Sequence, residues 1–240
     1  MPNNYFQFKE FLIQQDKCAM KVTTDACLFG AYIAEIISNS KLKIKNCLDI
    51  GTGSGLLSLM LAQKTNLLFD TVEIDEASYL QTKENFKQSP WANRIKIFHE
   101  DILQFNPRNK YDCIISNPPF YENDLKSEHD SKNKAKHDTS LTLKQLLQII
   151  NDKLTEDGIF FILIPFHRTK YFEMESASFG FYLKEKILVK QTPKHDFFRS
   201  ILFFSRGDTK IKTSEIIIKD EAENYTKEFI YLLKDYYLHL

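Results

Sequence analysis

Three glycines at alternate positions, Gly51, Gly53 and Gly55, separate two apolar runs near residue 50. The run before them, 47–50, is short enough for a buried strand, and the run after them, 56–63, is long enough for a helix that packs on a sheet. Glycine lets such a turn close tightly and lets backbone approach a ligand. The pattern predicts the first strand–loop–helix unit of an open α/β sheet.

The spacing of these glycines excludes two common classes of phosphate-binding loop. It reads G-x-G-x-G, whereas the dinucleotide fingerprint reads G-x-G-x-x-G, and no Gly-Lys-Ser/Thr follows as in a P-loop. Asp49 stands just before the first glycine, where it would repel a phosphate. We therefore interpret the loop as a nucleotide-type site that does not hold a phosphate there.

Three acids follow at the ends of the next two predicted strands. Glu73 lies near the end of strand 69–75, about 20 residues beyond the loop, where an acid meets a ribose in nucleotide-binding units. Asp75 either shares that role or caps the following helix. Asp101 follows strand 94–98 and is positioned to accept from an adenine amino group. Each acid alone is equally compatible with a solvated strand end.

An Asn-Pro-Pro-Phe segment, residues 117–120, follows the predicted buried strand 111–116. The Asn117 side-chain oxygen and the Pro118 carbonyl are acceptors that can hold both hydrogens of an amino group. Phe120 offers a flat face for a ring. The ligand expected is a planar group bearing NH2, such as an adenine, a guanine or a glutamine amide, and the alternative is a plain turn.

Together these motifs resemble the class I S-adenosylmethionine-dependent methyltransferases. More narrowly, residues 21–26 preceded by Cys-Ala-Met at 18–20, an early Phe6-x-Phe8, and residues 117–121 resemble the bacterial tRNA1(Val) adenine-N6 methyltransferases, which modify adenosine 37 beside the valine anticodon. The resemblance covers nearly the whole chain.

The resemblance implies a Rossmann-like α/β fold with a mostly parallel seven-stranded sheet, an antiparallel C-terminal hairpin strand and a short N-terminal extension. It implies one methyltransferase domain over 1–240, in which residues 1–40 form the extension and cover S-adenosylmethionine. Lys21 would meet the methionine carboxylate, helped by the Thr23 and Thr24 hydroxyls, although Lys21 is also compatible with an exposed surface charge.

These arguments give a set of site residues and a reaction, N6-methylation of an adenine in tRNA. The catalytic residues expected are Asn117, Pro118 and Phe120; the cofactor-binding residues are Lys21, Thr23, Asp49, Gly51, Gly53, Gly55, Glu73, Asp75, Asp101 and Asn117; and the substrate-binding residues are Pro119 and Tyr121. Asn117 and Pro118 would accept the amine hydrogens, so that catalysis is positioning with preorganised dipoles.

Other substrates remain open. A guanine-N2 methyltransferase of ribosomal RNA also fits the Asn-Pro-Pro-Phe end, but it would be expected to carry a larger RNA-binding domain. A glutamine-N5 methyltransferase would be expected to have Tyr at the place of Phe120 and an N-terminal helical bundle. A domain that binds cofactor without catalysis would be expected to have lost the glycines or Asn117.

Length and composition agree with one compact enzyme domain, which we expect to be a monomer in the cytoplasm. The 240 residues, 43% of them hydrophobic, suffice for one core, and no apolar run reaches the ~18 residues of a membrane helix. The start lacks a secretory signal. The cysteines read as reduced core thiols without metal-site spacing, and they are Cys18, Cys27, Cys47 and Cys113.

Periodicity and turn residues predict the remaining elements. A hairpin is expected around Phe6–Phe11, helices over 25–37 (capped by Asp25 or Thr24), 141–154, 172–179 and 222–237, and strands over 158–165, 184–191, 200–205 and 214–218. The polar segment 121–139 is expected to be a substrate lid.

Zero net charge means that RNA would have to be held by a local basic patch. The candidates are Lys126, Lys132, Lys134, Lys136, Lys184, Lys186, Lys190, Lys194 and Arg199.

Overall fold

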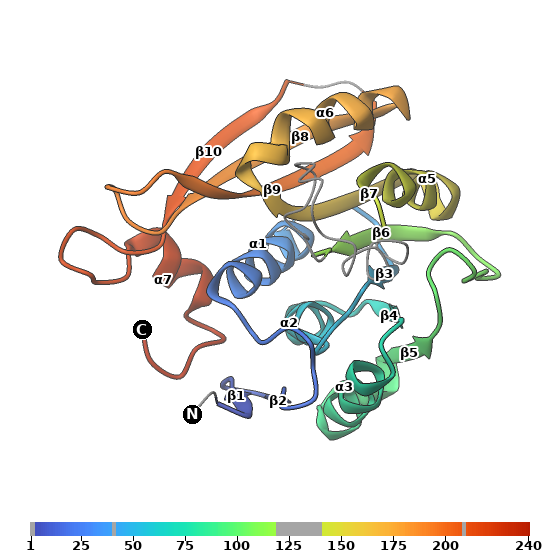
Figure 1. Cartoon of the computed structure of the whole chain (residues 1–240), viewed down its shortest axis with the longest axis horizontal. Helices are drawn as coiled ribbons and strands as arrows, with labels where there is room; N and C mark the ends of the chain where they lie inside the picture. The colour runs from blue at the N-terminus through green and yellow to red at the C-terminus, as the bar shows by residue number, and fades with distance from the viewer. Residues whose placement is uncertain (1–2, 40–41, 119–140, 208–209) are drawn as a thin grey trace, which may run out of the picture.

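The computed structural model describes residues 3–39, 42–118, 141–207 and 210–240 (Figure 1). The strands are β1 Tyr5–Gln7, β2 Leu12–Gln14, β3 Asn46–Ile50, β4 Leu68–Glu73, β5 Ile95–His99, β6 Tyr111–Ser116, β7 Leu154–Pro165, β8 Phe181–Lys190, β9 Phe197–Arg206 and β10 Lys212–Ile217. The helices are α1 Thr24–Asn39, α2 Leu56–Lys64, α3 Glu76–Gln88, α5 Leu143–Lys153, α6 Thr169–Ser178 and α7 Lys227–Leu233, with short 3-10 turns η1 Ala92–Arg94 and η2 Phe166–Arg168.

One eight-stranded sheet carries the fold, in the order β10-β8-β9-β7-β6-β3-β4-β5. Neighbours are parallel from β7 to β5 and between β10 and β8, whereas β9 is antiparallel to both β7 and β8. The predicted α/β class and the hairpin of the last long strands are confirmed. The sheet has one strand more than predicted, because β10 pairs along the whole end of β8 as an edge strand.

Helices cover both faces of this sheet, and the strands supply each face in turn (Figure 1). In β7, Phe161 and Leu163 face a core formed with α1, α2, α3 and α7, while Phe160 and Ile162 face a core formed with α5 and α6. Side chains of a strand alternate between faces, so a continuous apolar run in β7 serves two helical layers. This explains why residues 159–165 of β7 form an unbroken hydrophobic run.

Helix α1 is buried on nearly all sides, with ten of its sixteen residues inside the core. It begins at Thr24, and the Thr23 carbonyl accepts from Cys27 N at 3.0 Å. The predicted caps Thr24 and Asp25 are therefore in the first turn, not before it. Close packing on α2 explains Gly30, because a Cβ there would lie 2.7 Å from Met60 Sδ.

The C-terminal helix is shorter than the predicted span 222–237. It begins only after Thr226, whose Oγ1 accepts from Phe229 N at 3.3 Å. The residues before it form a turn in which Asp220 Oδ1 accepts from the amides of Ala222 and Asn224, both at 2.9 Å. Side-chain capping of this turn competes with helix formation, which explains the late start.

The two ends of the chain lie side by side (Figure 1). The predicted N-terminal hairpin forms from β1 and β2, and Phe8 after it bridges to Tyr237. Lys9 N donates to the Tyr236 carbonyl at 2.9 Å, and the Phe6 ring lies 5.7 Å from the Tyr237 ring. The hairpin is thus anchored by the C-terminal segment.

The helices and the cysteines each show one further feature. None of the helices in the described ranges has the length and apolar character needed to cross a membrane. All four cysteines are buried free thiols, as predicted. Cys47 and Cys113 lie opposite each other on the neighbouring strands β3 and β6.

Candidate active site

The predicted site residues of the core motifs converge at one edge of the sheet. We call it the carboxyl edge, where every strand of the large sheet except β9 ends and where β9 begins. Asp49 lies in β3, Glu73 ends β4 and Asn117 follows β6, and these three strands are adjacent. Ligands of open α/β sheets bind outside such an edge.

The glycine loop, residues 51–55, requires all three of its glycines. Their φ values are positive, at 70° for Gly51, 58° for Gly53 and 82° for Gly55. A Cβ at Gly51 or Gly53 would meet open space, whereas one at Gly55 would lie 2.5 Å from Phe86 Cε1. The first two glycines therefore keep the loop surface open, and the third allows α3 to approach.

Asp49 is fully buried and only half satisfied. Its Oδ2 accepts from Thr52 Oγ1 at 2.8 Å and Ser58 Oγ at 2.7 Å, while Oδ1 has no partner. Burial raises the pKa of Asp49 to about 6. An unpaired carboxylate oxygen inside a protein fits a cationic or donor group of a ligand. The partners Thr52 and Ser58 were not predicted, although a serine in an apolar helix was a usable signal.

Glu73 packs against the glycine loop and binds its backbone. The side chain is 8% exposed, with Oε2 accepting from Gly53 N and Oε1 from Asp75 N, both at 2.9 Å. Each carboxylate oxygen can accept a second hydrogen bond, so the expected contact with two ribose hydroxyls fits this placement. The Glu73 carbonyl also accepts from Glu100 N at 3.1 Å, which draws the end of β5 toward the same place.

The other two acids close turns at this edge. Asp75 is exposed and caps α3, because its Oδ1 accepts from Ser78 N at 2.8 Å, and this contact lowers the pKa of Asp75. Of its two predicted roles, capping is therefore the one observed. Asp101 Oδ1 accepts from Leu103 N at 2.9 Å, in the turn that follows β5.

Helix α3 holds the N-terminal segment against the glycine loop through two amide side chains that sequence reasoning missed. Asn85 Oδ1 accepts from Gln14 N at 3.0 Å, and Nδ2 donates to the carbonyls of Gln14 at 2.9 Å and Ser54 at 3.0 Å. Gln81 Oε1 accepts from the amides of Lys17 at 2.9 Å and Cys18 at 3.0 Å. One helix thus holds both the glycine loop and the N-terminal segment in place at the site.

Lys21 follows this anchored segment. It is half-buried, and its Nζ donates to the Gln15 carbonyl at 3.2 Å. The Val22 amide donates to Gln15 Oε1 at 2.8 Å, and Thr23 is exposed. The predicted contacts of Lys21 and Thr23 with a methionine carboxylate remain predictions.

The Asn-Pro-Pro-Phe end is described only in its first half. Asn117 is half-buried and Pro118 is buried, directly after Ser116, whose Oγ donates to the Ile50 carbonyl at 2.9 Å. This bond ties the end of β6 to the start of the glycine loop. Pro119, Phe120, Tyr121 and the predicted lid lie outside the described residues. Within the part of the chain that is described, no three His, Cys, Asp or Glu side chains are grouped to hold a metal ion.

Solved structures share this fold. A predicted O-methyltransferase from Agrobacterium tumefaciens matches with a TM-score of 0.65 and 13% identity, covering 88% of this chain and 96% of that one. The ribosomal protein L11 methylase from Lactobacillus delbrueckii matches with a TM-score of 0.56 and 18% identity, covering 82% and 84%. At such identities the likeness concerns the fold alone.

Sequence relatives are much closer. The family model of the methyltransferase small domain matches residues 31–180. A tRNA1(Val) (adenine(37)-N6)-methyltransferase of Flavobacterium johnsoniae is 38% identical, covering 98% of this chain and 100% of the relative. The enzyme of the same name from Dyadobacter fermentans is 39% identical, covering 99% of both. The chain is therefore a methyltransferase of the tRNA1(Val) (adenine(37)-N6)-methyltransferase family.

Proposed function

We propose that this enzyme transfers a methyl group from S-adenosylmethionine to N6 of an adenine in tRNA, and that the target is adenosine 37 of tRNA1(Val), the position in its relatives' names. The observation that carries the proposal is the place of Asn117, at the carboxyl end of β6 beside the glycine loop, in a chain that its relatives match end to end. A tRNA substrate agrees with the expected cytoplasmic location.

The residues at the carboxyl edge suit S-adenosylmethionine. The unpaired Asp49 Oδ1 would receive the ammonium group, and Glu73 would receive the ribose hydroxyls. Open space over Gly51 and Gly53 leaves the loop backbone accessible to a ligand. When bound, the cofactor supplies an electrophilic methyl group on sulfur. Residues 1–40 would form its cover.

Further contacts complete this proposed set. Asp101 would accept from the cofactor's adenine amino group. Asp75 would remain mainly a helix cap, with any ribose contact secondary. Lys21, with Thr23, would bind the methionine carboxylate after giving up its bond to the Gln15 carbonyl.

Asn117 and Pro118 would activate the target amine by position. The lone pair of adenine N6 is delocalised into the ring, so the amine is a poor nucleophile. If Asn117 Oδ1 and the Pro118 carbonyl accept its two hydrogens, the nitrogen becomes pyramidal and its lone pair points at the methyl group. The methylated nitrogen then carries a positive charge and releases one proton to water, so the step needs no general base.

The aromatic end of the motif would hold the base outside its stack. Stacking on Phe120 would return roughly 1–3 kcal/mol of the cost of turning the base out. Pro119 and Tyr121 would flank the ring.

Nucleoside mass spectrometry on an unmodified tRNA pool, incubated with the protein and S-adenosylmethionine, tests the proposal. We expect new N6-methyladenosine with the wild type and none with Asn117→Ala, which should still bind S-adenosylhomocysteine in calorimetry. N2-methylguanosine would support a guanine target instead, and no methylated nucleoside would overturn a tRNA substrate. Loss of cofactor binding in Asn117→Ala would remove the specific role of this side chain.

A further inference from the structure

The strand directions sort the basic residues that were candidates for RNA contact. Because β8 and β9 are antiparallel, with Lys190 paired to Phe197, the end of β8 lies at the carboxyl edge. Lys184, near the other end of β8, donates to the Gly207 carbonyl. Lys186 pairs with Glu173 at 2.8 Å. Lys190 and the exposed Lys194 are therefore the β8-side cations placed at the edge that carries Asn117.

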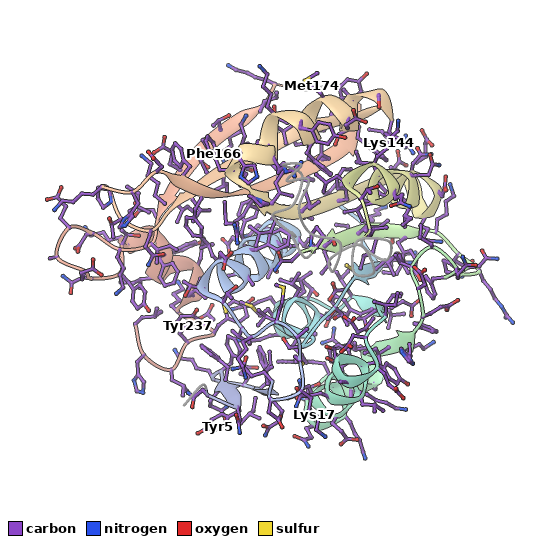
Figure 2. All side chains as sticks on the ribbon, in the orientation of Figure 1. Tyr5, Lys17, Lys144, Phe166, Met174 and Tyr237 are labelled. Atoms are coloured by element: carbon purple, nitrogen blue, oxygen red, sulfur yellow. The ribbon has the colours of Figure 1, made fainter. Side chains whose placement is uncertain are left out.

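Two aromatic rings accompany these cations. Phe166, labelled in Figure 2, is 39% exposed, and its ring lies 5.2 Å from the Phe197 ring. Lys190 Nζ lies 4.3 Å from the centre of the Phe197 ring. We call Phe166, Phe197, Lys190 and Lys194 the aromatic–basic platform. An exposed ring beside ammonium groups suits a nucleotide, whose base stacks while its phosphate meets the charge.

The charges around the platform leave it positive. Arg199 is neutralised by Asp25, with Arg199 Nε 2.8 Å from Asp25 Oδ2. Residues 190–199 contain one acid, Asp196, and two lysines, Lys190 and Lys194. The two lysines therefore outnumber the nearby unpaired acid of this hairpin. This positive balance is complementary to the phosphates of an anionic strand, and the exposed Phe166 ring adds a face on which a base can stack.

The platform lies within reach of the target base. In the parallel register of β6 and β7, Ser116 is level with Ile162. Phe166 is four residues further along the chain than Ile162, which is at most ~13 Å in the strand direction. A flexible single strand can span that distance with few nucleotides, so a base bound here would be close in sequence to the methylated one.

We propose that the aromatic–basic platform binds a tRNA nucleotide near the target adenosine, with its base stacked on Phe166 and its phosphate held by Lys190 and Lys194. The inference rests on the proposed function for its substrate, tRNA. It adds a second contact surface, on the β7–β9 side of Asn117, to the one that accepts the base.

Binding of a fluorescently labelled, unmodified tRNA transcript, measured by anisotropy at several salt concentrations, tests this surface. Phe166→Ala should weaken binding about 5-fold or more, as expected for a lost base stack. Lys190→Gln should weaken binding and make the slope of log K against log salt shallower by about 0.7–0.9, the change for one phosphate contact. The KM for tRNA should rise in both variants, with little change in S-adenosylhomocysteine affinity.

The opposite end of β8 provides matched controls. Tyr182 is 41% exposed, close to Phe166 in exposure, and Lys184 lies six positions before Lys190 in the same strand. Tyr182→Ala and Lys184→Gln should bind tRNA as the wild type does.

The outcomes separate this inference from the proposed function. If the wild type forms N6-methyladenosine in tRNA but the platform variants bind as tightly as the controls, the platform is wrong and the function stands. Equal weakening in both pairs of variants also overturns the platform. If the wild type neither binds nor methylates tRNA, the proposed function fails and the platform fails with it.

Discussion

At the scale of single residues, Asp49 shows the conflict between stability and binding most clearly. Its carboxyl group is fully buried, yet one oxygen has no partner. Leaving a charge unpaired inside a protein costs stability. A site that keeps such a group is prepared for a ligand that completes its hydrogen bonds.

Asp49→Asn should therefore stabilise the free protein in a pH-dependent way. The pKa of Asp49 is raised from 3.8 to about 6, so the carboxyl group favours folding below pH 3.8, and that contribution is lost as pH rises through 6. The amide cannot ionise, so its gain in unfolding free energy over Asp49 should grow between pH 4 and pH 7 and level off at about 3 kcal/mol. Urea unfolding at pH 4 and pH 8 measures this gain, and an equal difference at both pH values would contradict it. Affinity for S-adenosylhomocysteine should fall.

Gly53→Ala and Gly55→Ala should separate binding from packing. Both positions have positive φ, which costs an alanine about 1–2 kcal/mol. Only at Gly55 would the new Cβ also collide with Phe86, which adds about 1–3 kcal/mol. We expect the greater loss of unfolding free energy in Gly55→Ala. Gly53→Ala should mainly weaken cofactor binding, and equal destabilisation of the two variants would argue against this account.

At the scale of elements, α3 is the structural link between the glycine loop and the N-terminal segment that is proposed to cover the cofactor. Side chains of Gln81 and Asn85 replace missing backbone partners of the N-terminal segment, and Asn85 also holds Ser54 of the glycine loop. The end of β2 and the irregular segment after it are held in this way by a helix that itself packs on the sheet.

Asn85→Ala should release the N-terminal segment. The change removes three hydrogen bonds and leaves buried backbone groups unpaired, at a cost of about 2–4 kcal/mol. Hydrogen exchange at Gln14 and Lys17 should accelerate, and the affinity for S-adenosylhomocysteine should fall. Gln88→Ala, at an exposed position of the same helix, is the control. Unchanged exchange at Gln14 would show that the segment is held by other contacts.

Elements that depend on local pattern were predicted well from the sequence. The apolar runs that became β3, β6 and β7 and the glycine loop between β3 and α2 carry their own periodicity and turn residues. The predicted C-terminal helix was too long. The Asp220 turn and the cap at Thr226 delay its start, although the apolar residues before Thr226 follow a helical spacing. The edge strand β10 was recognised as a strand, but its partner depends on the three-dimensional order of the sheet.

Within the site, the sequence indicated which residues converge but not what they touch. Asp49, Glu73 and Asn117 lie at the ends of adjacent strands, as motif order predicts. The amides Gln81 and Asn85 contact partners more than sixty positions away, and one sequence contains no signal for such pairs. Contacts of this kind depend on tertiary structure and not on local spacing.

At the scale of the whole molecule, the N-terminal and C-terminal segments pack against each other. Tyr237 is 9% exposed and contacts the rings of Phe6, Phe8 and Phe229. The N-terminal extension therefore depends on residues more than two hundred positions later.

Tyr237→Ala should destabilise the fold by about 3–5 kcal/mol, as expected when a buried aromatic ring is removed. Loss of its contacts with Phe6 and Phe8 should also loosen the N-terminal hairpin. Tyr231→Ala is the control, because that side chain is 54% exposed and its change should cost little. Urea unfolding compares the two variants, and similar losses would show that the C-terminal segment is not a structural anchor.

The order of strands divides the molecule into two halves, for which we propose separate tasks. On one side of β6 lie β3, β4 and β5, which carry the glycine loop and the acids proposed to hold the cofactor. On the other side lie β7 to β10, and the shared methyltransferase model ends at residue 180, just before β8. In the proposed reaction the two halves meet at Asn117. If the aromatic–basic platform binds RNA as proposed, substitutions in the β8–β9 hairpin would alter the choice of RNA and leave the cofactor half of the sheet unchanged.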